Sequence, residues 1–207
     1  MPKDNMQKRY DFLSTFYSSM DTFPLLSNKE YFWRKEIIKK ILIYNPKNIL
    51  EIGTGPGMMI SIGTKISNNV KFIGIDVSMK MLRIAKKRTT ADYIQASGYR
   101  LPFRDRSIDS IIFAFTLTTV PETGLLVKES DRVLKKGGII GIIDGKKPDN
   151  KFMRTFFYLL DGVAILAGNT HFERDSMHLF EKYQYKQIFY KSFYWGLTFV
   201  TLIKKDS

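Results

Sequence analysis

The sequence EIGTGPG, Glu51 to Gly57, places three glycines at alternate positions between two apolar runs. The run before it, which includes Ile49 and Leu50, is typical of a β-strand, and the run 58–60 after it is typical of a helix. A glycine turn between a strand and a helix lets backbone N–H groups approach a ligand without a Cβ in the way. The stretch therefore predicts a nucleotide-binding turn.

The spacing of these glycines excludes two common nucleotide motifs. A dinucleotide fingerprint needs Gly-x-Gly-x-x-Gly, and although Gly53 and Gly55 match its first two glycines, Met58 stands at the third. A P-loop needs Gly-Lys followed by Ser or Thr, and no such sequence follows the turn. The turn by itself leaves the identity of the nucleotide open.

Strand-like and helix-like segments alternate downstream of Asn48. The strand-like runs are short and largely apolar, as expected for strands buried on both faces; they cover 48–53, 70–76, 91–96, 110–115 and 138–144. Helix-like stretches separate them at 58–67, 79–88 and 123–135. This alternation predicts a parallel sheet flanked by helices, with right-handed connections.

Both ends of the chain extend this core. Residues 6–20 and 29–43 show helical periodicity, Pro24 interrupts the pattern, and Ser27 with Glu30 fits a capping box for the second helix. A helical region is predicted over 152–183, and two consecutive strands, 185–193 and 196–205, are expected to pair antiparallel at a sheet edge. We expect a single domain, 1–207, comprising an N-terminal helical cap (1–45), a cofactor-binding core (46–145) and a helical insertion with the final strands (146–207).

The composition narrows the possible chemistry. The chain contains no cysteine, which excludes disulfides, thiolate metal sites and a cysteine nucleophile. With only two histidines, His171 and His178, no metal site is expected. The first residues lack the apolar core of a signal peptide, which favours a cytoplasmic location. The most apolar region, 152–168, is interrupted by Arg154 and Asp161 and is too short to span a bilayer comfortably.

The formal net charge is +13, which would suit nucleic acid or an anionic membrane surface. The basic residues are scattered, however, and most occur at helical spacing opposite apolar residues. Solvated helix faces therefore explain most of this charge.

The end of the second strand-like run indicates which ligand the turn binds. The sequence FIGIDVS ends its apolar run at Asp76. Ligands of open α/β sheets bind at the carboxyl ends of the strands, where an acidic residue can accept hydrogen bonds from both hydroxyls of a ribose. Asp76 is therefore the candidate ribose ligand.

Five ordered motifs carry a resemblance to a known family. ILEIGTGPG, FIGIDVS, YRLPF, SIDSIIFAFTLTTV and RVLKKGGIIGIID occur, over roughly residues 48 to 145, in the order of the class I S-adenosylmethionine-dependent methyltransferases. The resemblance implies a Rossmann-like α/β fold with a seven-stranded, mostly parallel sheet whose last strand is antiparallel. It also implies S-adenosyl-L-methionine as the cofactor.

The resemblance assigns cofactor contacts residue by residue. Glu51, Gly53, Thr54 and Gly55 would lie beside the methionine part, with Glu51 placing its amino group, and Asp76 would hold the ribose. The other contacts implied are Val77 on the adenine face, Ser97 and Gly98 at the adenine edge, and Phe115 with Thr116 beside the transferred methyl group. Ser97 stands where the family usually has aspartate, so adenine binding is expected to be weaker, because a neutral hydrogen bond is weaker than a charge-assisted one.

The sequence identifies no convincing general base. His171 is a weak candidate, and Thr118 and Thr119 occupy positions where many relatives place histidines. Because the sulfonium cofactor is already activated, the enzyme needs mainly to align the acceptor and exclude water.

The ends of the chain resemble those of the ubiquinone/menaquinone C-methyltransferases, in YDFLSTFYSSM, FWRKEI and WGLTFVTLIKK. This similarity implies a small, apolar or aromatic acceptor, such as a quinol ring carbon, and peripheral contact with a membrane. Two alternatives remain open, an RNA methyltransferase that uses the basic surface and a non-catalytic cofactor-binding protein. The sequence leaves the oligomeric state open.

Overall fold

The computed structural model describes residues 7–8, 10–11, 24–146, 177–194 and 196–206, with 24–30 described by their backbone. Gln7, Lys8, Tyr10 and Asp11 are helical, as predicted for this segment. The rest of the predicted helix over 6–20 and most of the predicted helical region over 152–183 lie outside the described residues.

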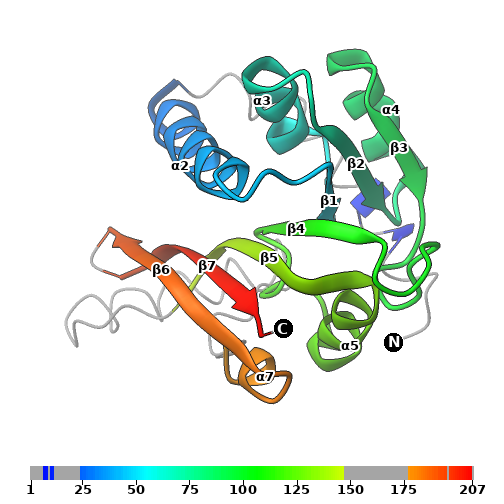
Figure 1. Cartoon of the computed structure of the whole chain (residues 1–207). Helices are drawn as coiled ribbons and strands as arrows, with labels where there is room; N and C mark the ends of the chain where they lie inside the picture. The colour runs from blue at the N-terminus through cyan, green and yellow to red at the C-terminus, as the bar shows by residue number, and fades with distance from the viewer. Residues whose placement is uncertain (1–6, 9, 12–23, 147–176, 195, 207) are drawn as a thin grey trace.

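A seven-stranded sheet forms the centre of the molecule (Figure 1), with the order β3-β2-β1-β4-β5-β7-β6. Strands β1 to β5 are parallel to one another, and β7 is antiparallel to both β5 and β6. The strands are β1 (Asn48–Ile52), β2 (Lys71–Asp76), β3 (Asp92–Gln95), β4 (Ile108–Ala114), β5 (Leu134–Gly145), β6 (Tyr185–Phe193) and β7 (Thr198–Lys205). The predicted fold class is confirmed. The strand order reverses between β1 and β4, which is where ligands of such sheets bind.

Helices cover both faces of the sheet (Figure 1). One face carries α2 (Pro24–Leu42), α3 (Met58–Ile66) and α4 (Met79–Arg88); the other carries α5 (Thr123–Val133) and α7 (Met177–Glu181). No helix among the described residues is long and apolar enough to cross a membrane.

Two boundaries differ from those predicted. The capping box at Ser27 is wrong, because α2 already begins at Pro24, whose missing N–H and fixed φ suit the first turn of a helix. The helix predicted over 123–135 ends at Val133, because Leu134 pairs with Ile108 of β4 and starts β5 four residues earlier than the apolar run at 138 suggests.

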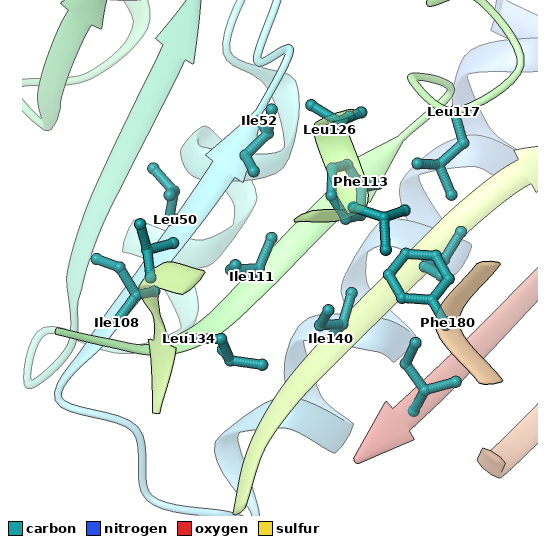
Figure 2. Packing of buried hydrophobic residues seen from close by; sticks show 14 of the residues in the cluster. Leu50, Ile52, Ile108, Ile111, Phe113, Leu117, Leu126, Leu134, Ile140 and Phe180 are labelled. Carbon is teal, nitrogen blue, oxygen red and sulfur yellow. The ribbon is translucent and has the colours of Figure 1, made fainter. Parts of the chain in front are cut away.

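The alternation of side chains along the strands divides the core into two clusters. Leu50 and Ile52 of β1 point to the α5 side and join the cluster drawn in Figure 2, which includes Phe113 and Phe180. Ile49 points to the other side and packs in the cluster that α2, α3 and α4 cover. Since successive strand residues face opposite sides, Glu51 shares the face of Ile49 and is directed towards α2.

Candidate functional site

The predicted glycine turn connects β1 to α3 at the carboxyl edge of the sheet. The N–H groups of Gly53 and Thr54 both donate to the Ile75 carbonyl oxygen at 2.9 Å, which ties the turn to β2. Gly53, Gly55 and Gly57 have φ angles of 73°, 51° and 77°, in the region that favours glycine.

The three glycines serve different purposes. A Cβ on Gly53 would lie 2.8 Å from the Thr116 side chain, and one on Gly57 would lie 2.8 Å from the Ala85 Cβ. A Cβ on Gly55 would meet nothing within 4 Å. Close packing therefore requires Gly53 and Gly57, whereas Gly55 faces open space that a ligand can occupy.

Asp76 meets this turn from the end of β2. Its Oδ2 accepts a hydrogen bond from Gly55 N at 2.8 Å, and its Oδ1 accepts one from Ser78 N at 2.8 Å. Burial raises the pKa of the Asp76 carboxyl, although the hydrogen bonds from Ser78 and Gly55 oppose the shift. Ser78 also caps α4 by accepting from Met81 N, and its hydroxyl donates to Asp11 Oδ1 at 2.5 Å. Asp11 of the N-terminal segment therefore lies beside Asp76.

Glu51 is a buried carboxyl group one residue before the end of β1, with 2% of its surface exposed. Thr54 Oγ1 donates to Glu51 Oε2 at 2.5 Å, so the hydroxyl group of Thr54 is directed towards Glu51. Burial raises the pKa of Glu51 to about 7, although the Thr54 hydrogen bond and the charge of Arg34 lower it. The negative charge of Asp76 adds to the rise.

The predicted adenine contacts lie after β2 and β3. Val77 is half-buried, and its carbonyl oxygen accepts from Gln95 Nε2 at 3.0 Å. Ser97 Oγ accepts from Tyr99 N at 3.3 Å, which leaves a lone pair and the hydroxyl proton for other partners. A Cβ on Gly98 would lie 2.4 Å from Leu126 Cδ1, so this glycine lets the loop pack closely against α5.

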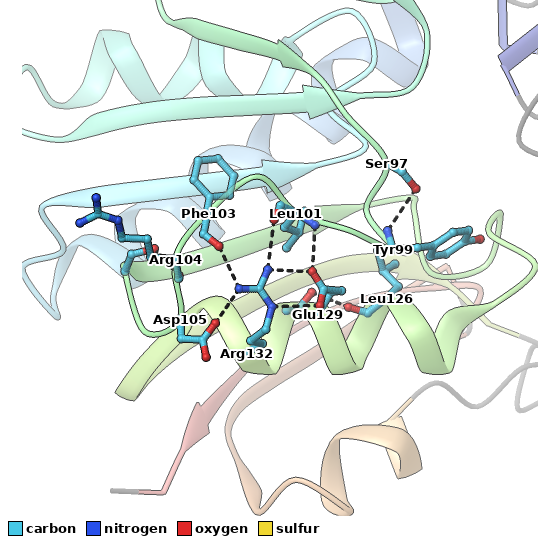
Figure 3. Close-up of polar contacts among 11 residues, drawn as sticks. Ser97, Tyr99, Leu101, Phe103, Arg104, Asp105, Leu126, Glu129 and Arg132 are labelled. Atoms are coloured by element: carbon cyan, nitrogen blue, oxygen red, sulfur yellow. Dashed lines mark hydrogen bonds and ion pairs between the residues drawn. The ribbon is translucent and has the colours of Figure 1, made fainter.

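A charged cluster fixes the loop that carries Ser97 and Gly98 (Figure 3). The Arg132 guanidinium of α5 donates to the carbonyl oxygens of Leu101 and Phe103 at 3.1 and 2.9 Å. It also pairs with Glu129, which accepts from Leu101 N at 2.9 Å. Hydrogen bonding to Arg132 lowers the pKa of the Glu129 carboxyl, so this cluster stays charged.

Phe115 and Thr116 follow β4 next to the glycine turn. Phe115 has a φ of 55°, which is uncommon for a residue with a side chain, and its N–H donates to the Ile143 carbonyl oxygen at 2.7 Å. Thr116 Oγ1 donates to the Ile52 carbonyl oxygen at 3.0 Å. These contacts hold the end of β4 against the end of β1.

The loop after Thr116 is held by Asp144 at the end of β5. Asp144 accepts hydrogen bonds from Leu117 N and Thr118 N through Oδ2, and from Thr118 Oγ1 and Gly145 N through Oδ1. Burial raises the pKa of Asp144 to about 6 despite these bonds. Thr119 Oγ1 donates to the Thr116 carbonyl oxygen at 2.9 Å. The hydroxyl protons of both threonines are therefore used within the protein.

The remaining candidates for catalysis and metal binding are the histidines. His171 lies outside the described residues, and His178 is exposed on α7. Among the described residues there is no group of three or more His, Asp or Glu side chains that could hold a metal ion.

Two residues of the site were not singled out from the sequence. Arg34 had a detectable signal, because it is a charged residue at helical spacing among the apolar residues Trp33, Ile37 and Ile41. Asp144 had a signal similar to that of Asp76, since it too follows an apolar strand run.

The comparison with protein families identifies the chain. The model described as the ubiE/COQ5 methyltransferase family matches residues 2–205. The chain belongs to this family. The predicted family and group are thereby confirmed.

Individual relatives of this family member are also methyltransferases by name. A demethylmenaquinone methyltransferase from Thermotoga maritima is 32% identical over 170 residues, which cover 80% of this chain and 70% of the relative. A ubiquinone/menaquinone biosynthesis C-methyltransferase from Geotalea daltonii is 30% identical over 175 residues, covering 80% of this chain and 71% of the relative. The crystal structure of a SAM-dependent methyltransferase from Thermotoga maritima superposes with a TM-score of 0.73 at 20% identity, covering 94% of this chain and 98% of that chain.

This ubiE/COQ5 family member is therefore an S-adenosylmethionine-dependent methyltransferase, and S-adenosyl-L-methionine is its cofactor. The carboxyl edge fits that cofactor in three respects. Open space lies above Gly55, Asp76 has carboxylate lone pairs beside that space, and the buried carboxyl of Glu51 can receive an ammonium group.

Proposed function

We propose that this enzyme transfers a methyl group to a ring carbon of a quinol that carries an apolar tail. The observation that carries the proposal is the match to the ubiE/COQ5 family over residues 2–205, together with curated relatives named for demethylmenaquinone and for ubiquinone/menaquinone biosynthesis. In this proposal the chain is a single domain, 1–207, made of an N-terminal cap (1–45), a cofactor-binding core (46–145) and an insertion with the final strands (146–207).

The geometry of the carboxyl edge supports a role for each predicted cofactor ligand. In this proposal Asp76 accepts hydrogen bonds from the ribose hydroxyls, and Glu51 binds the ammonium group of the methionine part. Thr54 acts through Glu51, because its hydroxyl donates to that carboxyl group. The other contacts proposed are Gly53 and Gly55 along the methionine part, Val77, Ser97 and Gly98 around the adenine, and Phe115 with Thr116 beside the methyl group.

The reaction requires little acid–base chemistry from the protein. The cofactor supplies a methyl group on a positively charged sulfur. Ionisation of a quinol hydroxyl raises the electron density of the ring carbon, which forms the new C–C bond as the C–S bond breaks, and the ring proton is then lost. The main tasks of the chain are to align the ring carbon with the methyl group and to exclude water.

The threonine hydroxyls after β4 are too weakly basic to abstract a ring proton, but their lone pairs can orient a hydroxyl group of the acceptor. Thr118 and Thr119 already donate their hydroxyl protons, to Asp144 and to the Thr116 carbonyl oxygen respectively. His171 remains the weak candidate for the base that accepts the ring proton, with water as the alternative.

We also propose that the middle of α2, residues 31–35, contacts a membrane surface, from which an apolar acceptor would enter. Phe32 and Tyr31 are 65% and 40% exposed, and Lys35 Nζ lies 5.7 Å from the centre of the Tyr31 ring. Exposed aromatic rings flanked by lysine suit the interface of an anionic bilayer. Sedimentation with phosphatidylglycerol vesicles should be weakened by Phe32→Glu and not by Leu125→Glu, which alters an exposed leucine of α5. Equal sedimentation of all three proteins would rule this contact out.

The decisive experiment for the acceptor is a methyl-transfer assay. The enzyme is incubated with S-adenosylmethionine carrying a deuterated methyl group and with a short-chain demethylmenaquinone, either oxidised or reduced by dithionite. Mass spectrometry should detect one added methyl group on the reduced ring only, and Asp76→Ala should abolish it. Calorimetric binding of the cofactor without transfer to either ring would contradict the proposal, and labelling of RNA instead would favour an RNA methyltransferase.

A further inference from the structure

The face of α2 that packs on the sheet carries Arg34 among apolar side chains. Ile37, Ile38 and Ile41 have 0% of their surface exposed, and Trp33 has 8%. Arg34 lies on the same side of the helix and is half-buried. A charge among apolar residues is costly unless an opposite charge lies near it, and the buried Glu51 carboxyl supplies one such charge near Arg34.

Arg34 is directed to the carboxyl edge of the sheet, where the glycine turn lies. Its guanidinium carbon is 5.6 Å from the centre of the Phe115 ring, at the end of β4. Its positive charge also acts on the buried Glu51 carboxyl at the end of β1. The guanidinium therefore lies near both the methionine end of the proposed cofactor site and the side chain expected beside the methyl group.

Packing on both sides of Arg34 fixes its position. Trp33 contacts the rings of Phe193 and Tyr194, with centroid distances of 4.9 and 5.5 Å. One turn further along, Ile37 lies against β5 so closely that a Cβ on Gly141 would be 2.8 Å from Ile37 Cδ1. The helix cannot slide or rotate without disturbing these contacts, so Arg34 is held in place before a ligand arrives.

We propose that Arg34 binds the α-carboxylate of S-adenosylmethionine, beside Glu51, which binds the ammonium group of the same amino acid. The methionine part is a zwitterion, and Glu51 complements only its positive group. A guanidinium can donate two parallel hydrogen bonds to a carboxylate, which a lysine cannot reproduce. The inference rests on the cofactor contacts of the proposed function and is independent of the methyl acceptor.

The test compares two ligands that differ only in the carboxylate. Isothermal titration calorimetry measures the dissociation constants of S-adenosylhomocysteine and of its decarboxylated analogue, which keeps the amino group. Arg34→Met should weaken S-adenosylhomocysteine roughly 10- to 100-fold, as expected for loss of charge-assisted hydrogen bonds. It should change the affinity for the decarboxylated analogue less than about threefold, because that ligand has no group for Arg34 to bind.

Lys39→Met is the matched control, because it removes a positive charge from an exposed position on the same helix. It should leave both affinities unchanged. Arg34→Lys should restore part of the lost affinity for S-adenosylhomocysteine. If Arg34→Met does not fold, the same comparison with Arg34→Lys should still show a loss confined to the ligand with the carboxylate.

Equal weakening of both ligands would overturn the inference, because Arg34 would then act only by balancing the charge of Glu51. Unchanged affinity for S-adenosylhomocysteine would overturn it as well. Failure of the proposed acceptor would give a different result, namely Arg34-dependent binding of S-adenosylhomocysteine without methylation of the quinol.

Discussion

Glu51→Gln should stabilise the protein at alkaline pH while removing a cofactor contact. The substitution keeps the shape of the side chain and an oxygen that can accept from Thr54, but it removes the titration. Burial raises the pKa of Glu51 to about 7 in the folded protein, compared with 4.5 for an exposed glutamate. This difference corresponds to about 3 kcal/mol of folding free energy.

The direction of the pKa shift of Glu51 determines whether stability rises or falls with pH. Because the folded pKa of Glu51 is raised, the folded protein retains this proton to higher pH than the unfolded chain does. The contribution of Glu51 is therefore complete below pH 4.5 and is lost as the pH rises through about 7. Between pH 5 and pH 8 the wild-type protein should lose about 2.5 kcal/mol that the variant keeps.

Urea unfolding at pH 5 and pH 8 measures how much the free energy of unfolding changes with pH in each of the two proteins, and the two changes are then compared. Effects that do not depend on pH cancel, as do the other titrating groups to the extent that they are independent of Glu51. Glu122→Gln, at an exposed position, should follow the wild type at both pH values. If Glu51→Gln also follows the wild type, the carboxyl does not titrate in this range and the reasoning fails.

Glu51→Gln should also change how the affinity for the cofactor product depends on pH. The ammonium group of S-adenosylhomocysteine requires the ionised form of Glu51, so wild-type affinity should rise as the pH passes through about 7. Calorimetry at several pH values should find weaker binding in Glu51→Gln with a smaller dependence on pH in this range.

Five further substitutions test other parts of the site and of the fold. Gly55→Ala and Gly137→Ala introduce a Cβ at positive φ with no neighbour within 4 Å, so each should destabilise the fold by about 1 kcal/mol, and only Gly55→Ala should weaken S-adenosylhomocysteine. Equal binding by both variants would show that Gly55 does not face the ligand. Asp144→Asn should cost about 2–3 kcal/mol in urea unfolding and lower kcat more than it weakens S-adenosylhomocysteine, whereas Thr118→Val, which removes one hydrogen bond, should cost about 1 kcal/mol. A larger loss of stability in Thr118→Val than in Asp144→Asn would contradict the role given to Asp144. Arg132→Met should lower the free energy of unfolding by about 1–2 kcal/mol, and an unchanged urea midpoint would show that its bonds to the 101–103 loop are not stabilising.

The sheet could be predicted from local sequence because its strands are short apolar runs bounded by polar residues. The boundaries that failed were decided by contacts between distant residues. Leu134 joins β5 because Ile108 of β4 lies beside it, and no local pattern in 134–137 signals that pairing. The predicted start of α2 is wrong because of a local ambiguity: a proline interrupts the interior of a helix but also suits its first turn, which is where Pro24 lies.

Some residues of the candidate site could also be predicted from local sequence, whereas others are placed by contacts between distant segments. Glu51, Gly55 and Asp76 could be predicted together, because parallel neighbouring strands bring their carboxyl ends to one edge. Arg34 joins them only through the packing of α2 on the sheet. Asp144 joins the 116–120 loop only through the pairing of β4 with β5. These two placements depend on tertiary geometry that single-residue patterns do not contain.

The charge of the site is opposite to that of the protein as a whole. The net charge is +13, yet the buried ionisable groups at the carboxyl edge include Glu51, Asp76 and Asp144. Burial raises the pKa of all three carboxyl groups, so their ionised forms are less favourable in the ligand-free protein than in water. Such a site stabilises a ligand more strongly when that ligand brings positive charge into it.

An acidic site of this kind should distinguish the methyl donor from its product. The donor carries a sulfonium charge that the product lacks, while the amino acid and the ribose are the same in both. If the acidic edge is selected for the sulfonium, neutralising Asp144 or Glu51 should reduce the affinity for S-adenosylmethionine more than that for S-adenosylhomocysteine. The preference for the donor would then arise from charges that are unfavourable in the empty site, and the stability gained by Glu51→Gln at high pH would measure part of that unfavourable energy.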